Sequence, residues 1–172
     1  MLVYTIGHST RTLEDFEALL KAHGVAQLAD VRTVPRSRRH PHFSSDALSR
    51  SLPSAGVVYR HFAGLGGLRK PRADSPNTAW RHEGFRGYAD YMATPDFERA
   101  LDELVEFARA GPTAVMCAEA VWWRCHRQLV ADALVARSIE VRHIMSADAA
   151  PPHTLTEFAQ AAEGKVTYRR LI

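Results

Sequence analysis

The sequence has little cysteine, no long hydrophobic run and no large excess of either charge. Only two cysteines occur in 172 residues, which excludes a fold held by several disulfides and favours reduced thiols. No apolar stretch approaches the roughly 20 residues that span a bilayer. The short apolar stretch at the N-terminus follows no early Lys or Arg, so it does not resemble a signal peptide. We therefore expect a soluble cytoplasmic protein with no membrane partner.

Two common nucleotide-binding motifs are also missing. There is no Walker loop, and no G-x-G-x-x-G follows the first predicted strand. The glycine-rich GLGG at residues 64–67 lies in a long loop without a helix signal after it, so it indicates a phosphate loop only weakly. The net charge of +3 is too small to indicate duplex binding by itself.

The first part of the chain has the pattern of a βαβ unit. An apolar strand over residues 2–6 precedes a helix that begins after Thr12, with Asp15 in a capping-box position, and ends at Gly24. A second strand over residues 25–31 completes strand, helix and strand in about 30 residues. With 46% hydrophobic and 24% charged residues, the composition is that of a globular protein.

The same alternation continues along the chain. Further strands are expected at residues 57–62, 113–117 and 139–144, and further helices at 46–52, 84–93, 95–110 and 125–137. A last helix at 154–162 and an edge strand at 166–172 would close the chain. The prediction is one α/β domain over residues 1–172, with a mostly parallel sheet and helices on both faces, in a Rossmann-like three-layer arrangement.

Polar residues follow three of the predicted strands. His8 and Ser9 follow the first, Arg32 follows the second, and Glu119 follows the buried strand TAVMC. Ligands bind outside the carboxyl ends of parallel strands. We therefore expect Arg32, Glu119 and Arg127 to meet His8 in one positively charged pocket that binds phosphate or sulfate.

The segment CAEAVWWRCHR combines thiols with basic groups. Cys125, His126 and Arg127 open a predicted helix, where free amide groups favour anions and lower the pKa of a thiol. Cys117 ends a buried strand, so it is expected to be a core residue. Cys125 should therefore react faster than Cys117, unless the indoles at residues 122–123 shield it. Those indoles either stack on a ring or cover the domain.

Several roles remain open for the other residues. His8 is a general acid or base, or a histidine that satisfies backbone groups. Glu119 is a general base or the ion-pair partner of Arg32 or Arg127. The basic loop over residues 32–44, RTVPRSRRHPHFS, either binds phosphate or is simply solvated. Long irregular stretches of this kind often build a site or a lid.

A metal centre is not predicted. Cys117, Cys125, His126 and His8 are soft ligands, but C-x7-C-H is not a usual zinc spacing.

Five motifs in order, TIGHST, ADVRTVPRS, YRHFAGLGG, YADYMATPDFERAL and CAE followed by CHR, are together specific. They resemble the domain of unknown function family 488 over about residues 3–145. The resemblance implies a shared site and brings no activity with it. The residues it implies as a signature are Gly7, His8, Ser9, Asp30, Arg32, Pro35, Ser37, Tyr59, Gly66, Gly67, Cys117, Glu119, Cys125, His126 and Arg127.

Three functions compete at this point. The first is an enzyme acting on a phosphate-bearing or nucleotide-like substrate, the second a nucleotide or nucleic-acid binding module, and the third a metal or redox site on the two cysteines. For the enzyme, the candidate catalytic residues are His8, Glu119 and Cys125, and the candidate anion ligands are Ser9, Arg32, His126 and Arg127. The expected partner is an anionic small molecule or nucleotide, and the sequence names no cofactor and no oligomeric state.

Overall fold

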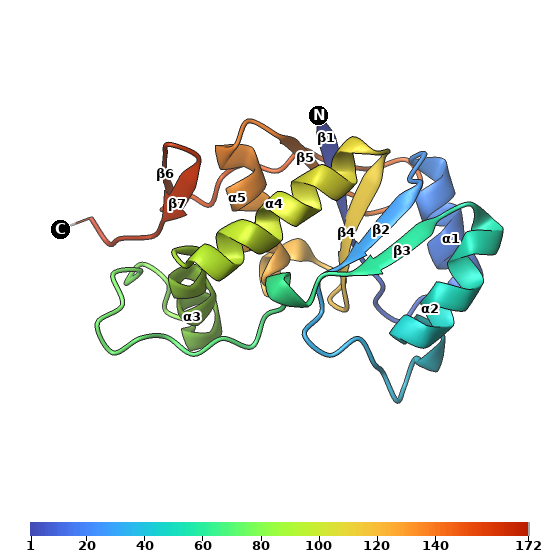
Figure 1. The fold of residues 1–172 in the computed structure, drawn as a ribbon, viewed down its shortest axis with the longest axis horizontal. Helices are drawn as coiled ribbons and strands as arrows, with labels where there is room; N and C mark the ends of the chain where they lie inside the picture. Colours follow the sequence, from blue (N-terminus) through green and yellow to red (C-terminus); the bar gives the residue numbers. More distant parts are fainter. Residues whose placement is uncertain (172) are drawn as a thin grey trace.

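A five-stranded sheet forms the centre of the protein in the computed structural model, which describes residues 1–171 (Figure 1). The strand order is β3-β2-β4-β1-β5, and each of the four pairings is parallel, as predicted. The strands are β1 (Leu2–Gly7), β2 (Gln27–Asp30), β3 (Val58–His61), β4 (Thr113–Cys117) and β5 (Glu140–His143).

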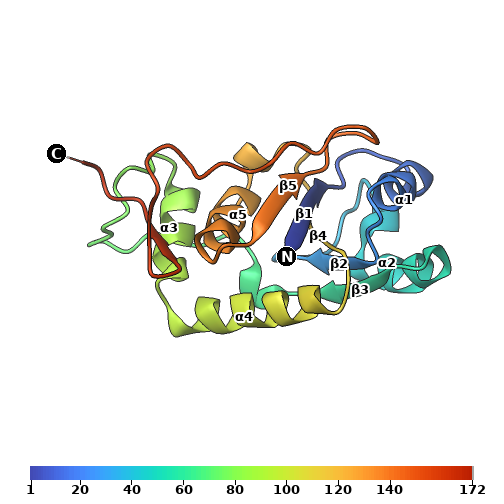
Figure 2. The ribbon, with the colours of Figure 1, turned by 90° about the horizontal axis from the view of Figure 1, so that it is seen from above.

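Helices cover both faces of this sheet, which confirms the three-layer prediction (Figure 2). On one face lie α1 (Leu13–Ala22) and α2 (Ser45–Ser51). On the other face lie α3 (Glu83–Met92), α4 (Pro95–Arg109) and α5 (Arg127–Ala136). Successive strand residues point to opposite faces, so the central strands β1, β2 and β4 contribute to two separate cores.

Local capping explains where two of the helices begin. The Thr12 hydroxyl accepts a hydrogen bond from the Asp15 amide, and the Thr94 hydroxyl accepts one from the Phe97 amide, as the sequence predicts. α5 begins at Arg127, two residues later than expected, and its N-cap residue His126 makes no side-chain capping bond. Cys125 therefore lies in the loop that leads into α5.

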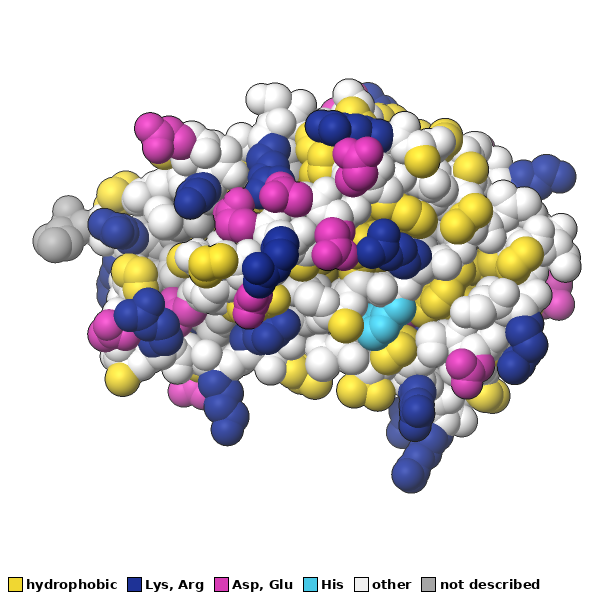
Figure 3. All heavy atoms as spheres, viewed as in Figure 1, with side chains coloured by type: hydrophobic (Ala, Val, Ile, Leu, Met, Phe, Trp, Pro, Cys, Tyr) yellow, Lys and Arg dark blue, Asp and Glu magenta, His cyan; other side chains and the backbone are white. Residues whose placement is uncertain are grey.

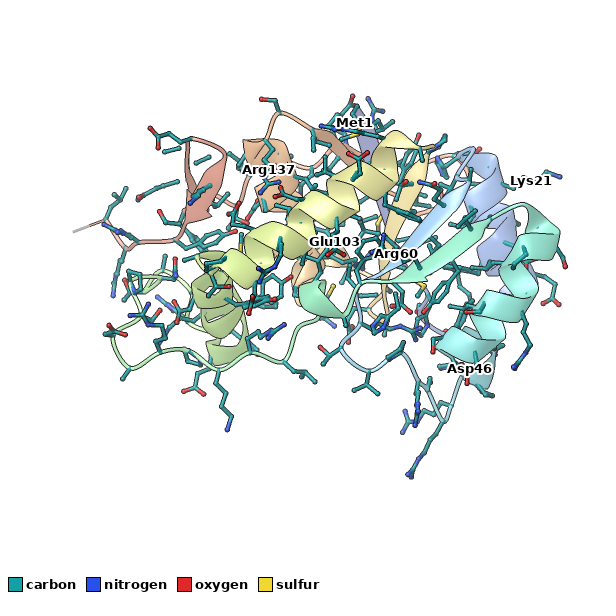
Figure 4. All side chains as sticks on the ribbon, viewed as in Figure 1. Met1, Lys21, Asp46, Arg60, Glu103 and Arg137 are labelled. Carbon is teal, nitrogen blue, oxygen red and sulfur yellow. The ribbon has the colours of Figure 1, made fainter. Side chains whose placement is uncertain are left out.

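Salt bridges tie the sheet and helices together at the surface. Arg60 of β3 donates to Glu103 of α4 across 3.0 Å, and Arg137, just after α5, reaches α4 (Figure 4). These pairs are partly or largely exposed, so each contributes little to stability.

The C-terminal part differs from the prediction. No helix forms over residues 154–162, and the chain instead makes a separate antiparallel hairpin of β6 (Gln160–Ala162) and β7 (Lys165–Thr167). The expected edge strand over residues 166–172 is also wrong, because β7 pairs with β6 and not with the main sheet; residue 172 lies outside the described residues. Glu163 and Gly164, with φ of 52° and 75°, supply the left-handed residues of the tight turn.

The carboxyl ends of β1, β2 and β4 lie side by side, as predicted. Gly7 is in register with Cys117, and Asp30 with Met116. The loops after β1 and β2 lead to one face of the sheet, whereas the loop after β4 leads to α5 on the other. In α/β sheets, ligands bind at the carboxyl edge where the connections diverge in this way, and in Figure 1 that edge faces downward.

None of the helices within residues 1–171 combines the length and the hydrophobicity that a membrane crossing requires.

Candidate functional site

A pocket of about 670 Å³ opens at the carboxyl ends of β1, β2 and β4. Six of the seven predicted site residues line it: His8, Ser9, Arg32, Glu119, Cys125 and His126. Arg127 is not among the lining residues and is only 2% exposed. The sheet topology thus brings together residues that are more than a hundred positions apart in the chain.

The loops after β1 and β4 are held against each other by their backbones. The amides of His8 and Ser9 donate to the carbonyls of Cys117 and Ala118, both at 2.9 Å. A Cβ atom on Gly7 would lie 1.7 Å from the Glu119 carbonyl oxygen, so only glycine permits this approach. Ser9 has a φ of 50°, a strained value for a residue with a side chain.

His8 is buried beneath the pocket and stacks on Phe43, with ring centroids 4.4 Å apart. Its Nδ1 lies 2.8 Å from the Ser9 carbonyl. A carbonyl only accepts, so Nδ1 carries the hydrogen and Nε2 accepts from Arg32 at 3.4 Å. Burial lowers the pKa of His8 to about 4. With both ring nitrogens engaged, His8 is placed to orient Arg32 more than to move protons.

Arg32 is paired within the protein. Its Nε and one terminal nitrogen donate to the two carboxylate oxygens of Asp30, at 2.9 and 2.7 Å, and the same terminal nitrogen donates to the Phe43 carbonyl at 2.6 Å. The Tyr59 hydroxyl also donates to Asp30, at 2.6 Å. The Asp30 carboxylate thus balances most of the Arg32 charge, which weakens Arg32 as an anion ligand.

Arg127 lies behind the pocket and holds the sulfur of Cys125. Its Nε donates to Cys125 Sγ at 3.2 Å, and its terminal nitrogens donate to the Glu119 carbonyl at 2.5 Å and to the Thr5 hydroxyl at 3.5 Å. Its backbone amide also points at Cys125 Sγ, at 3.4 Å. This guanidinium therefore faces a thiol and the loop backbone and not open solvent.

The two cysteines are in direct contact, with their sulfur atoms 2.8 Å apart. Burial by itself raises the pKa of Cys125, but the contacts with Cys117 and Arg127 outweigh it and lower that pKa to about 6. The hydrogen bond to Cys125 and burial raise the pKa of Cys117 well above its ordinary range. At neutral pH the pair therefore carries its negative charge on Cys125.

His126 and Glu119 complete the polar lining. Nε2 of His126 donates to the Val31 carbonyl at 2.8 Å, so Nδ1 carries the free lone pair, and burial lowers the pKa of His126 to about 4. The Glu119 side chain is exposed, and none of the salt bridges within residues 1–171 involves it. Glu119 is thus not the ion-pair partner that one sequence-based interpretation made it.

The rim of the pocket mixes basic and apolar side chains. Arg36 and Arg39 line it from the loop after β2 and are exposed. Val34 and Leu68 line it too and are 59% and 87% exposed, so the rim also has apolar portions. Basic side chains project from the lower edge of the molecule in Figure 3. The arginines were predicted from the sequence, whereas Val34 and Leu68 were not, because an apolar residue in a predicted loop carries no signal that it lines a pocket.

A buried chain of hydrogen bonds connects the site to the C-terminal part. The Thr5 hydroxyl, which Arg127 contacts, lies 2.6 Å from His143 Nδ1; His143 Nε2 lies 2.8 Å from His153 Nδ1, and His153 Nε2 lies 2.8 Å from Asp132. Sequence reasoning missed this network. Its only signal is polar residues, such as Thr5, inside otherwise apolar strands.

The same network holds the loop that contains the tryptophans. The Trp122 ring stacks on His143 with centroids 4.1 Å apart and planes within 3°. Trp123 lies edge-on against Trp122 and is 49% exposed. One indole therefore packs onto the domain, as expected for at least one of them, while the other stays accessible.

No group of three or more His, Cys, Asp and Glu side chains within residues 1–171 is arranged to hold a metal ion.

Comparison with known proteins gives one match. The model of the family described as "Domain of unknown function DUF488" matches residues 12–134, which is more than half of the chain. This range includes Arg32 and the segment from Cys117 to Arg127, whereas His8 and Ser9 precede it. No curated protein and no solved structure matches the chain.

Proposed function

Because the chain belongs to the DUF488 family, whose description assigns no reaction, we propose its function from the site: an enzyme whose Cys125 thiolate attacks a phosphate-bearing, nucleotide-like substrate. The observation that carries the proposal is the contact between Arg127 Nε and Cys125 Sγ at 3.2 Å, at the wall of a pocket of about 670 Å³. A buried arginine aimed at a thiol stabilises the thiolate, which is the nucleophilic form.

The rim supports the choice of substrate. Arg36 and Arg39 are exposed and bring positive charge to the mouth of the pocket, whereas Arg32 and Arg127 are engaged inside the protein. Guanidinium groups bind phosphate through charge-assisted hydrogen bonds. The exposed Val34 and Leu68 beside them favour a ligand that also has an apolar or flat ring portion. A nucleotide-like phosphate ester combines these two properties.

The proposed reaction proceeds in two steps. The Cys125 thiolate attacks phosphorus, a sulfur–phosphorus bond forms, and the bond to the leaving-group oxygen breaks; that oxygen takes a proton from water. In the second step the Glu119 carboxylate accepts a proton from a water molecule that attacks phosphorus, and sulfur leaves again as thiolate. His8 orients Arg32, and Arg127 positions the Cys125 sulfur. Neither His8 nor Arg127 takes part in proton transfer. A thiolate nucleophile must stay reduced, so the proposal places the protein in the cytoplasm.

Two measurements test this proposal. In the first, native protein is alkylated with iodoacetamide over a range of pH, and labelling of each cysteine is followed by mass spectrometry. Cys125 should label faster than Cys117 at neutral pH, with a midpoint near pH 6. Cys117 is the internal control, and equal labelling of the two would remove Cys125 as the nucleophile.

In the second measurement, turnover of an aryl phosphate and of nucleoside monophosphates is compared in the native protein and in Cys125→Ser. We expect turnover to fall at least a hundredfold, on the order expected for loss of a covalent nucleophile. Binding of inorganic phosphate, followed by thermal stability, should persist. Undiminished turnover by Cys125→Ser would refute the proposal.

A second candidate is a nucleic-acid binding module, favoured by the accessible Trp123 and the exposed arginines of the loop after β2. Under that alternative, single-stranded oligonucleotides bind with a strong salt dependence, Trp123→Ala weakens binding, and no phosphate ester is turned over.

A further inference from the structure

The two cysteine side chains meet although they come from different elements. Cys117 is the last residue of β4, and Cys125 lies just before α5, with the loop over residues 118–124 between them. Their sulfur atoms are 2.8 Å apart, both thiols are free, and both belong to the lining of the pocket. Neither the family match nor the proposed reaction requires a second thiol at this position.

We propose that Cys117 and Cys125 form a reversible intramolecular disulfide that withdraws the Cys125 sulfur from reaction. Formation of the bond stands on the geometry of the pair alone. Its consequence, an inactive enzyme, rests on the proposed function. A disulfide needs its sulfur atoms about 2.05 Å apart, so the two side chains need to shift by less than about 1 Å. The nearby backbone is a loop and can absorb such a shift.

The surroundings give the two thiols different parts in the oxidation. The Cys125 sulfur accepts from two donors of Arg127, the guanidinium Nε and the backbone amide, so it holds the negative charge and is the sulfur that attacks an oxidant. Cys117 is 3% exposed and is the last residue of an apolar strand, so its thiol stays protonated until Cys125 beside it has become a sulfenic acid. Cys125 is therefore the attacking residue and Cys117 the resolving one.

The reaction balances with a peroxide as oxidant. The Cys125 thiolate attacks one peroxide oxygen, the oxygen–oxygen bond breaks, hydroxide leaves, and Cys125 becomes a sulfenic acid. The sulfur of Cys117 then attacks the sulfenic sulfur, and the hydroxyl leaves as water with the proton of the Cys117 thiol. Two thiol sulfurs are oxidised and one peroxide is reduced. A small dithiol reverses the process by thiol–disulfide exchange.

The disulfide also protects the sulfur it blocks. A sulfenic acid without a neighbouring thiol is oxidised further to sulfinic acid, which small thiols do not reduce. Cys117 intercepts Cys125 before that step, since the two sulfurs are already in contact. The inference thus gives the buried Cys117 a use that a purely structural core residue does not need.

Peroxide treatment of the full-length protein tests the inference. In the native protein we expect a mass loss of two hydrogen atoms, loss of iodoacetamide labelling at both cysteines, and a tryptic peptide linking Cys117 to Cys125. A small dithiol should restore labelling of Cys125 completely. In Cys117→Ser the same treatment should give a sulfenic acid trapped by dimedone, followed by sulfinic acid that the dithiol does not reverse. In Cys125→Ser, Cys117 should remain reduced.

The outcomes separate this inference from the proposed function. If native protein and Cys117→Ser accumulate the same sulfinic acid at the same rate, no disulfide forms and the inference is wrong, whatever turnover shows. If the disulfide forms and the reduced protein turns over no phosphate ester, the proposed function fails and the redox pair stands. If the disulfide forms and the oxidised protein keeps its full turnover, the switch is refuted.

Discussion

The arginines of the site share a charge but differ in what surrounds them. Arg32 meets a carboxylate of equal and opposite charge, whereas Arg127 meets a thiol, a hydroxyl and a backbone carbonyl. A buried guanidinium without a carboxylate partner is costly unless another group supplies negative charge. The Cys125 thiolate is that group. The charges of Arg127 and Cys125 are thus mutually dependent.

Replacing Arg127 by Lys should expose this dependence. Lysine keeps the charge but lacks the Nε donor and the fork that contacts sulfur and carbonyl together. The pKa of Cys125 should rise from about 6. For a rise of one unit, alkylation of Cys125 at pH 6 slows roughly fivefold, in proportion to the thiolate fraction. The pH profile of labelling measures the change.

Arg124→Lys is the matched control for that substitution. Arg124 is exposed three residues earlier, in the segment that leads into α5, so its replacement should leave the pH profile of Cys125 labelling unchanged. If both variants label like the native protein, Arg127 does not stabilise the thiolate.

At the scale of elements, the C-terminal part is held by Asp132 on α5. This buried carboxylate accepts hydrogen bonds from His153, from the Thr156 amide and hydroxyl, and from the Tyr168 hydroxyl, at 2.7–3.0 Å. These tertiary bonds hold the segment around Thr156 in a non-helical conformation. The helix predicted over residues 154–162 is wrong because hydrogen bonds to Asp132 on α5 override the local helix propensity. Such tertiary contacts are not visible in the sequence.

The elements that sequence does predict are those with local signals. The capping residues Thr12 and Thr94 and the continuous apolar run of β4 placed two helices and the central strand, and parallel topology then placed their ends together. The partners of each site residue could not be predicted. That Arg32 pairs with Asp30, and Arg127 with Cys125, depends on side-chain directions fixed by packing.

The Asp132→Ala substitution tests the role of that carboxylate. It leaves several buried donors without an acceptor, and we expect the free energy of unfolding to fall by about 3–5 kcal/mol, as when one partner of a buried ion pair is removed. Asp102→Ala is the control, because Asp102 pairs with Arg137 but is 69% exposed, and its loss should cost less than about 1 kcal/mol. Urea unfolding measures both. Equal losses would mean that the Asp132 network does not hold the C-terminal part.

At the scale of the whole molecule, several histidines are buried in neutral form around the site. Burial lowers the pKa of His8 and His126 to about 4 and that of His143 to about 3. In the neutral state His8 and His126 each donate to a backbone carbonyl, and His143 is hydrogen-bonded to the Thr5 hydroxyl. Folding therefore depends on keeping three imidazoles without charge, which makes the stability of the protein a function of pH.

The direction of that dependence follows from linkage. Between pH 6.5 and pH 4 the unfolded chain binds protons on these histidines and the folded protein does not, so the free energy of unfolding falls as the pH falls. The lowered pKa of Cys125 acts in the same direction, since the stability from its thiolate is lost as the pH falls through about 6. We expect the free energy of unfolding to fall by several kcal/mol between pH 7 and pH 4, measured by urea unfolding at fixed ionic strength.

His143→Gln should flatten the dependence of the unfolding free energy on pH below pH 6.5, because one group no longer takes up a proton on unfolding. His23→Gln is the control and should leave the slope unchanged, since His23 is not buried. A stability that stays constant from pH 7 to pH 4.5 would show that these imidazoles take up protons in the folded protein as readily as in the unfolded chain. The acceptor role assigned to His8 Nε2 would then be wrong, because both nitrogens of a protonated imidazole donate.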